Sequence, residues 1–399
     1  MKKAAVFFLA VSLGAALYSQ DRLAENSSAH YEISGPEGGG DSTAAEMEAR
    51  FEAYNQVFRF DPSLLAGPLK VRVFTSQDEY DAYVSARLGG PRPGAVYLHY
   101  SDPGHRELVI HRGSAEADRL VPHQAFIQFL RGFIPQPPGW IREGFAIYFS
   151  SQTFDRETAS LGQGENLDWL ETAKKAAPVS PEAVFLADKN GPPPDFPALA
   201  WSLAAFFMAA PAGGTAPAPP SAGTAPAGGA APDYRRALTD AFMVLSPSAG
   251  AEENAQAVYR RITLIAREED LSKDYNAYLG AKKTFPQLVT EGQAAYGAKN
   301  FSGAGDLFRQ ARELKKDHPL PYYYLGLLAY EGKDYTGAEA LYQQARDRGA
   351  DKALIQYALG VNAAAAGKTA EAVSLLKEAA AADPGKYKSR TEDLIKRLQ

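Results

Sequence analysis

The sequence predicts an α+β domain, built from a small sheet and helices, followed by an all-α repeat array. Two observations support this prediction. Between residues 26 and 280, short alternating apolar runs typical of strands are interspersed with longer helical patterns. From residue 285 to residue 384, small and large apolar residues recur every 34 positions. The chain has 399 residues, more than one ordinary domain, which favours such a division.

Composition excludes several functional classes. Lys and Arg number 42 against 47 Asp and Glu, a formal net charge of −5, so the basic surface of a dedicated nucleic-acid binder is not expected. The chain contains no Cys, which excludes disulfides, cysteine nucleophiles and thiolate zinc sites. Any metal ion must therefore be held by His and carboxylate side chains.

The first 19 residues have the pattern of a secretory signal peptide. Two lysines precede an apolar run from Ala4 to Leu17, which is shorter than the roughly 20 residues of a membrane-spanning helix. An uncleaved amphipathic anchor is the alternative interpretation. Since a lysine-rich start and a short apolar run suit a bacterial signal, we expect export to the periplasm and no stable membrane span after cleavage.

The region from 26 to 280 begins as a mixture of strands and helices and becomes helical later. In chain order, the expected elements are a helix at 46–58, a strand at 69–74, a helix at 78–86, paired strands at 94–99 and 106–111, and a helix at 114–131. Residues 211–232 are almost entirely Pro, Ala, Gly, Ser and Thr. We expect a disordered insertion there, between helices at 199–210 and 233–245, with an interdomain linker as the alternative.

A short segment within this region carries a family resemblance. Residues 138–149 read PGWIREGFAIYF, and with the preceding order of strands and helices they resemble the gluzincin metallopeptidases, most closely the peptidase MA-like bacterial proteins. In active members, an upstream HExxH helix supplies two His ligands and a Glu base, and the Glu of the later segment completes a zinc site. The resemblance therefore implies a gluzincin-like fold.

This chain departs from the zinc motif at two positions. The expected HExxH reads HQAFI, so that His123 matches the first ligand, Gln124 replaces the base and Ile127 replaces the second ligand, while Glu143 matches the third. Glutamine is not a useful proton acceptor near neutral pH, and isoleucine has no donor atom for a metal. We therefore expect a degenerate site with no hydrolytic activity and no cofactor.

An altered zinc site is the alternative hypothesis. It would use His123 and Glu143 with a third group from the predicted hairpin, and Tyr148 as a hydrogen-bond donor to an oxyanion. The candidates for the third group are His99, His105 and His111. On this interpretation the protein would be a zinc-dependent peptidase or amidase.

The 34-residue period is evident at three sets of small residues. They are Gly292, Gly326 and Gly360; Ala304, Ala338 and Ala372; and Ala311, Ala345 and Ala379. This pattern resembles the tetratricopeptide repeat, in which small residues let two antiparallel helices approach closely. The resemblance implies three repeats over 285–384 and a capping helix at 385–399.

In this family the first helix of each repeat lines the concave surface. The residues expected to bind a protein or peptide partner there are Tyr296, Tyr323, Leu327, Tyr330, Tyr357 and Val361. Packing of these tyrosines between repeats is the alternative. The sequence thus favours an exported interaction or scaffold protein, with a pseudo-metallopeptidase domain and a repeat arm. A further hypothesis is that the front domain is structural and that the repeats assemble an envelope or periplasmic complex.

Overall fold

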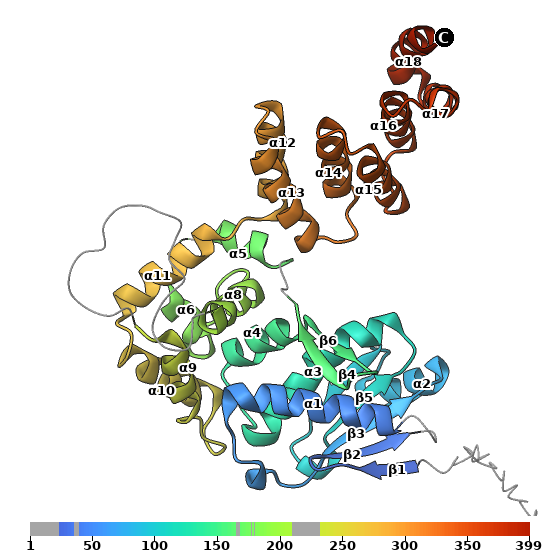
Figure 1. Ribbon diagram of the computed structural model, residues 1–399. Coiled ribbons are helices and arrows are strands. Elements are labelled where there is room, and N and C mark those ends of the chain that lie inside the picture. The colour runs from blue at the N-terminus through green and yellow to red at the C-terminus, as the bar shows by residue number, and fades with distance from the viewer. Residues whose placement is uncertain (1–23, 36–39, 165–167, 177, 179, 210–231) are drawn as a thin grey trace, which may run out of the picture. The chain divides into compact units, whose positions relative to one another are not determined.

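The chain folds into two compact units, shown in the computed structural model of Figure 1. The first unit lies within residues 1–166 and 179–272, and the second within 167–178 and 273–399. The structure describes residues 24–35, 40–164, 168–176, 178, 180–209 and 232–399. The predicted signal peptide lies outside the described residues, and so does the predicted insertion apart from its last residue, Pro232.

A mixed five-stranded sheet forms the base of the first unit. Its strands, in spatial order, are β1 (Ala24–Ser27), β2 (Tyr31–Gly35), β3 (Leu69–Phe74), β5 (Glu107–His111) and β4 (Ala95–Leu98). The three central strands are parallel, and both edge strands run antiparallel to their neighbours. The predicted pairing of residues 94–99 with 106–111 is confirmed as the β4–β5 ladder. Strand β1 was not among the expected elements.

Helices cover both faces of this sheet (Figure 1). Helix α2 (Gln77–Leu88) packs Tyr80 and Val84 against Val109 of β5. On the opposite face lie α1 (Gly40–Phe58) and α3 (Ala115–Phe133). Because β5 is covered on both sides, four of its five residues are buried, as is typical of a central parallel strand.

Helix α4 (Gly139–Phe149) is fixed at its start and in its middle. The Gly139 backbone N–H donates to Oδ2 of Asp188 over 2.8 Å, so a carboxylate satisfies the beginning of the helix. At Gly144, a Cβ would lie 2.3 Å from the carbonyl oxygen of Ala200, in α8 (Phe196–Ala209). The glycine thus lets α4 lie directly on the backbone of α8. The other elements of this unit are η1 (Pro62–Leu64), η2 (Pro103–His105), β6 (Gln152–Asp155), β7 (Ser160–Gln163), α6 (Pro181–Phe185), α7 (Ala187–Asn190), α9 (Tyr234–Phe242) and α10 (Ala251–Thr263).

The second unit begins before the repeats. It includes α5 (Leu170–Ala176), whose Lys174 Nζ donates to Oε1 of Gln287 over 3.3 Å, and the chain enters it through α11 (Glu268–Ala281). The expected domain boundary at residue 280 therefore differs from this division, which assigns residues 167–178 and 273–280 to the unit that holds the repeats. These contacts join segments more than 100 residues apart, which local sequence patterns do not report.

Three antiparallel helix pairs follow, with one further helix. They are α12 (Phe285–Gly297) with α13 (Phe301–Leu314), α14 (Pro319–Glu331) with α15 (Tyr335–Asp347), α16 (Lys352–Ala365) with α17 (Thr369–Ala382), and finally α18 (Pro384–Leu398). None of the described helices combines the length and apolar character needed to cross a bilayer.

Each helix pair is closed by a glycine in its first helix facing a large residue in its second. A Cβ added to Gly292, Gly326 or Gly360 would lie 2.8, 2.5 or 2.8 Å from the side chain of Phe308, Tyr342 or Leu376, respectively. The 34-residue register predicted from the sequence is confirmed by this repeated contact.

Replacing Gly326 by Ala tests this packing. The new methyl group would overlap Tyr342, and we expect the change to destabilise the α14–α15 pair by about 1–3 kcal/mol. Hydrogen exchange of amides in residues 319–347 measures the effect. The control is Gly297→Ala at the end of α12, where a Cβ meets no atom within 4 Å. Equal protection in both variants would contradict the predicted close contact.

Candidate functional site

The degenerate motif residues lie on two helices that pack against each other, α3 and α4. His123, Gln124 and Ile127 on α3 and Glu143 on α4 are all half-buried. Burial lowers the pKa of the His123 imidazole, and the negative charge of Glu143 partly offsets this effect. The carboxylate of Glu143 on α4 is therefore near enough to the His123 imidazole on α3 to act on it electrostatically.

Gln124 connects α3 to the edge of the sheet. Its Oε1 accepts a hydrogen bond from the backbone N–H of Tyr97 in β4 over 3.0 Å. Its Nε2 lies 3.4 Å from Nδ1 of His123. The amide thus supplies an acceptor to a backbone donor that points away from the β4–β5 ladder, which gives this residue a structural role at the expected base position.

Glu143 is paired with an arginine beside it. Its Oε1 accepts from Nε of Arg142 over 3.0 Å, and both side chains are about 30% exposed, at 28% and 32%. Arg131 lies two turns beyond His123 on α3 and interacts electrostatically with Arg142 and Glu143. Burial and the positive charge of Arg142 lower the pKa of the Arg131 guanidinium. The surroundings of the carboxylate therefore carry guanidinium groups.

The three hairpin histidines each have other neighbours. Burial and the nearby charges of Arg131 and Arg106 lower the pKa of His99 to about 4. His105 Nδ1 lies 3.1 Å from Oδ2 of Asp102 at the surface.

The third histidine, His111, lies close to α2. Its ring centroid lies 5.8 Å from that of Tyr80. Across the part of the chain that the structure describes, no three His, Asp or Glu side chains are grouped so that they could hold a metal ion. The structure thus does not bring a hairpin histidine to His123 and Glu143. The ring of Tyr148, the proposed oxyanion donor, contacts those of Phe145 and Phe149.

The second candidate site lies on the first helices of the repeats. The six expected partner-binding residues are half-buried on α12, α14 and α16: Tyr296, Tyr323, Leu327, Tyr330, Tyr357 and Val361. Helix α14 carries a single charged residue, Glu331, and its own aromatic and aliphatic residues lie on all sides of the helix. One side of α14 packs on α15, while Tyr323, Leu327 and Tyr330 remain only partly buried.

Two of these tyrosines also contact residues of the following helix pair or of α18. The Tyr296 hydroxyl donates to Oε1 of Glu331 over 3.2 Å, and the ring centroids of Tyr357 and Tyr387 are 5.0 Å apart. Burial, with neighbouring phenols that include Tyr296 and Tyr357, raises the pKa of Tyr323 to about 12. Phenols from three successive first helices are therefore close enough to interact. Tyr296 and Tyr357 therefore contact neighbouring repeats or α18 and are still only partly buried.

Sequence reasoning did not single out Tyr324. This ring stacks on Phe308 with centroids 4.5 Å apart, and its hydroxyl accepts from Nε2 of Gln293 over 3.1 Å. It joins the first repeat to the second. The adjacent position, Tyr323, recurs at the 34-residue spacing as Tyr357, whereas Tyr324 has no aromatic counterpart, so the repeat arithmetic gave no signal for it.

Comparison with protein families agrees with this architecture. Residues 289–353 and 325–387 match the family model described as tetratricopeptide repeat. No curated protein matches the chain. The C-terminal region therefore contains tetratricopeptide repeats, and such repeats indicate protein–protein interaction.

The proximity of His123 to Glu143 leads to a prediction about pH. Because burial holds the imidazole pKa below its ordinary value of about 6.5, the folded chain binds fewer protons than the unfolded chain just below that pH. Stability contributed by this group is therefore lost as pH falls from about 6.5 toward the folded pKa. Glu143→Gln removes the charge that favours the imidazolium, and we expect the pKa to fall further.

A pH titration of the His123 imidazole resonance by NMR measures this shift. Glu79→Gln, on the exposed side of α2, is the control and should leave the His123 pKa unchanged. An unchanged or raised pKa in Glu143→Gln would show that the two groups do not interact.

Proposed function

We propose that this protein is an exported, non-catalytic interaction or scaffold protein. The repeat arm recruits a protein or peptide partner, and the first unit is a pseudo-metallopeptidase. The observation that carries the proposal is the half-buried row of aromatic and aliphatic residues on α12, α14 and α16. Such a surface favours an apolar partner segment, since its aromatic rings offer area for burial and its phenols offer hydrogen bonds.

The support for a pseudo-metallopeptidase is the set of contacts made by the side chains at the motif positions. Gln124 bonds to the backbone of Tyr97, and Ile127 has no donor atom. Glu143 is paired with Arg142, whose positive charge opposes a nearby cation. The side chains present at these positions do not fit a zinc ion.

The proposed compartment is the bacterial periplasm. The support is the pattern of residues 1–19, with its lysines and short apolar run. Interaction repeats on an exported protein are consistent with assembly of a partner complex in the cell envelope.

Restoring a ligand tests the pseudo-metallopeptidase proposal. Ile127→His places a second imidazole one turn from His123 and facing the same side of α3, so that with Glu143 three ligands become available. In calorimetric titrations at neutral pH, we expect the unchanged chain to bind no zinc at micromolar concentration and the variant to bind one equivalent. The matched control, Ile127→Leu, should behave as the unchanged chain.

Binding of one zinc equivalent by the unchanged chain would contradict the proposal. It would favour the alternative, a zinc-dependent peptidase or amidase with unusual ligands, and would justify a hydrolase assay. Absence of binding in both the unchanged chain and Ile127→His would show that His123, Glu143 and position 127 do not form a common site.

Adding a charge to the repeat surface tests the partner proposal. Leu327→Glu introduces a carboxylate into the half-buried row on α14, and desolvating that charge beneath an apolar partner should weaken binding at least tenfold. Gln344→Glu, an exposed position on α15, adds the same carboxylate away from the row. The full chain serves as bait in envelope extract, and the affinity of each identified partner is then measured with both variants. Equal weakening by the two changes would contradict the assigned surface.

A further inference from the structure

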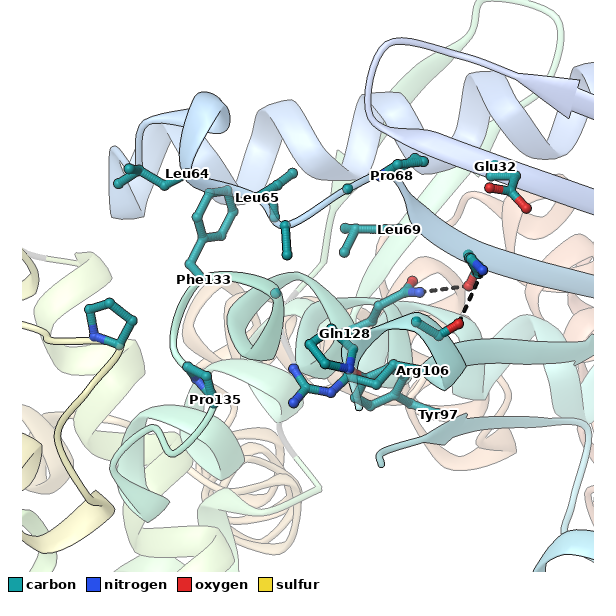
Figure 2. A pocket seen from close by; sticks show the side chains of 17 residues that line it. Glu32, Leu64, Leu65, Pro68, Leu69, Tyr97, Arg106, Gln128, Phe133 and Pro135 are labelled. Carbon is teal, nitrogen blue, oxygen red and sulfur yellow. Dashed lines mark hydrogen bonds between the residues drawn. The ribbon is translucent and has the colours of Figure 1, made fainter. Parts of the chain in front are cut away.

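The first unit contains a pocket of about 520 Å³, separate from the motif residues. It lies where η1 leads into β3, beside the loop that contains η2 and the last turns of α3 (Figure 2). Neither His123 nor Glu143 lines it. Its size is in the ordinary range for a small-molecule or peptide-end site.

One wall of the pocket carries a buried polar group without a partner. Gln128 is 1% exposed, and its Nε2 donates to the Lys70 carbonyl over 2.7 Å, as Figure 2 shows. Its Oε1 has no hydrogen-bond partner among the described residues. An unpaired buried acceptor costs about 1–3 kcal/mol. Neighbouring atoms cover this oxygen, so a ligand donor reaches it, and recovers a favourable bond, once the lining side chains shift.

Two cationic residues line the same pocket. The guanidinium of Arg106 is held by the carbonyls of Tyr100 and Ser101, at 2.6 Å from Nε and 3.1 Å from Nη2. Its Nη1 makes no hydrogen bond within the described residues, and Lys70 also lines the pocket. Glu32 is the single acidic residue of the lining, so the two cations leave an excess positive charge.

The opposite wall is apolar. Leu64, Leu65 and Phe133 line it, and the Leu64 side chain is 72% exposed, unusual for a residue of this kind. Gly132 on α3 lets the side chains of Leu65 and Leu69 pack against the helix, because a Cβ there would lie 3.0 Å from Leu69 and 3.1 Å from Leu65. The pocket therefore pairs an apolar surface with a cationic, hydrogen-bond-accepting surface.

From this arrangement we infer that the pocket binds the C-terminal residue of a peptide with an apolar side chain. The terminal carboxylate meets Arg106 and Lys70, the backbone N–H of the last residue donates to Oε1 of Gln128, and the side chain packs on Leu64, Leu65 and Phe133. A simple fatty acid offers the carboxylate and the apolar chain but no N–H donor for Gln128. This inference uses neither the repeats nor the zinc motif and is independent of the proposed function.

The ligand itself supplies the first test, on the unchanged full chain. Calorimetry compares acetyl-Ala-Ala-Leu bearing a free carboxylate, the same peptide with a C-terminal amide, and dodecanoate. We expect saturable binding of the free acid, with at least tenfold weaker binding of the amide, since loss of the charge removes the contact with Arg106 and Lys70. No saturable binding of the acid at millimolar concentration, equal binding of acid and amide, or tighter binding of dodecanoate would each overturn the inference.

A pair of glycine variants locates the site. Gly67 lines the pocket, and a Cβ there meets no atom within 4 Å, so Gly67→Leu should fill the pocket without a clash and abolish binding of the free acid. Gly90→Leu is the matched control, since its nearest contact is Arg92 Nη1 at 3.9 Å and it does not line the pocket. Circular dichroism verifies that both variants fold. Unchanged binding in Gly67→Leu would place the peptide elsewhere and overturn the assignment.

Discussion

The arrangement of the first unit depends on the close approach of α4 to α8 at Gly144. With a 2.3 Å separation between a hypothetical Cβ and the Ala200 carbonyl oxygen, any larger residue would push the two helices apart. Asp188 fixes the start of α4 at the same time, by accepting from the Gly139 N–H. The helix is therefore held at two points along its length. Its position in turn decides where Glu143 lies relative to His123 on α3.

Two glutamines hold α3 against the sheet, each by a hydrogen bond between its side-chain amide and a strand backbone. Gln124 and Gln128 lie one turn apart on one face of the helix, and each bonds to a strand backbone, at Tyr97 in β4 and Lys70 in β3. At the first of these positions a glutamate base would be needed for zinc chemistry, yet a neutral amide serves the structural bond equally well. A neutral amide at position 124 is therefore compatible with a stable fold.

What the sequence predicted depended on whether the signal was local. The 34-residue spacing of Gly292, Gly326 and Gly360 predicted the helix pairs because each glycine packs within its own repeat. Strand β3 and the β4–β5 hairpin were also predicted from short patterns. The parallel order of the central strands was not, since it depends on pairings between distant segments. Strand β1 and the β6–β7 hairpin are local, but their four-residue strands, AENS, QTFD and SLGQ, lack the alternating apolar pattern that predicts a strand. Glu143 acts electrostatically on His123, whereas the hairpin histidines have other neighbours, which spacing alone does not reveal.

The pocket shows why a site built from distant segments escapes sequence reasoning. Its lining residues come from six or more separate stretches between Glu32 and Pro247, and no motif connects them. Its chemistry also differs from that of the repeat surface. Arg106 and Lys70 make the pocket cationic, whereas the half-buried row on α12, α14 and α16 has little charge. A cationic pocket selects a ligand by its charged end, while an uncharged aromatic row selects by apolar area. The ligands proposed for the two units are therefore chemically different, so loss of binding at one surface does not predict loss at the other.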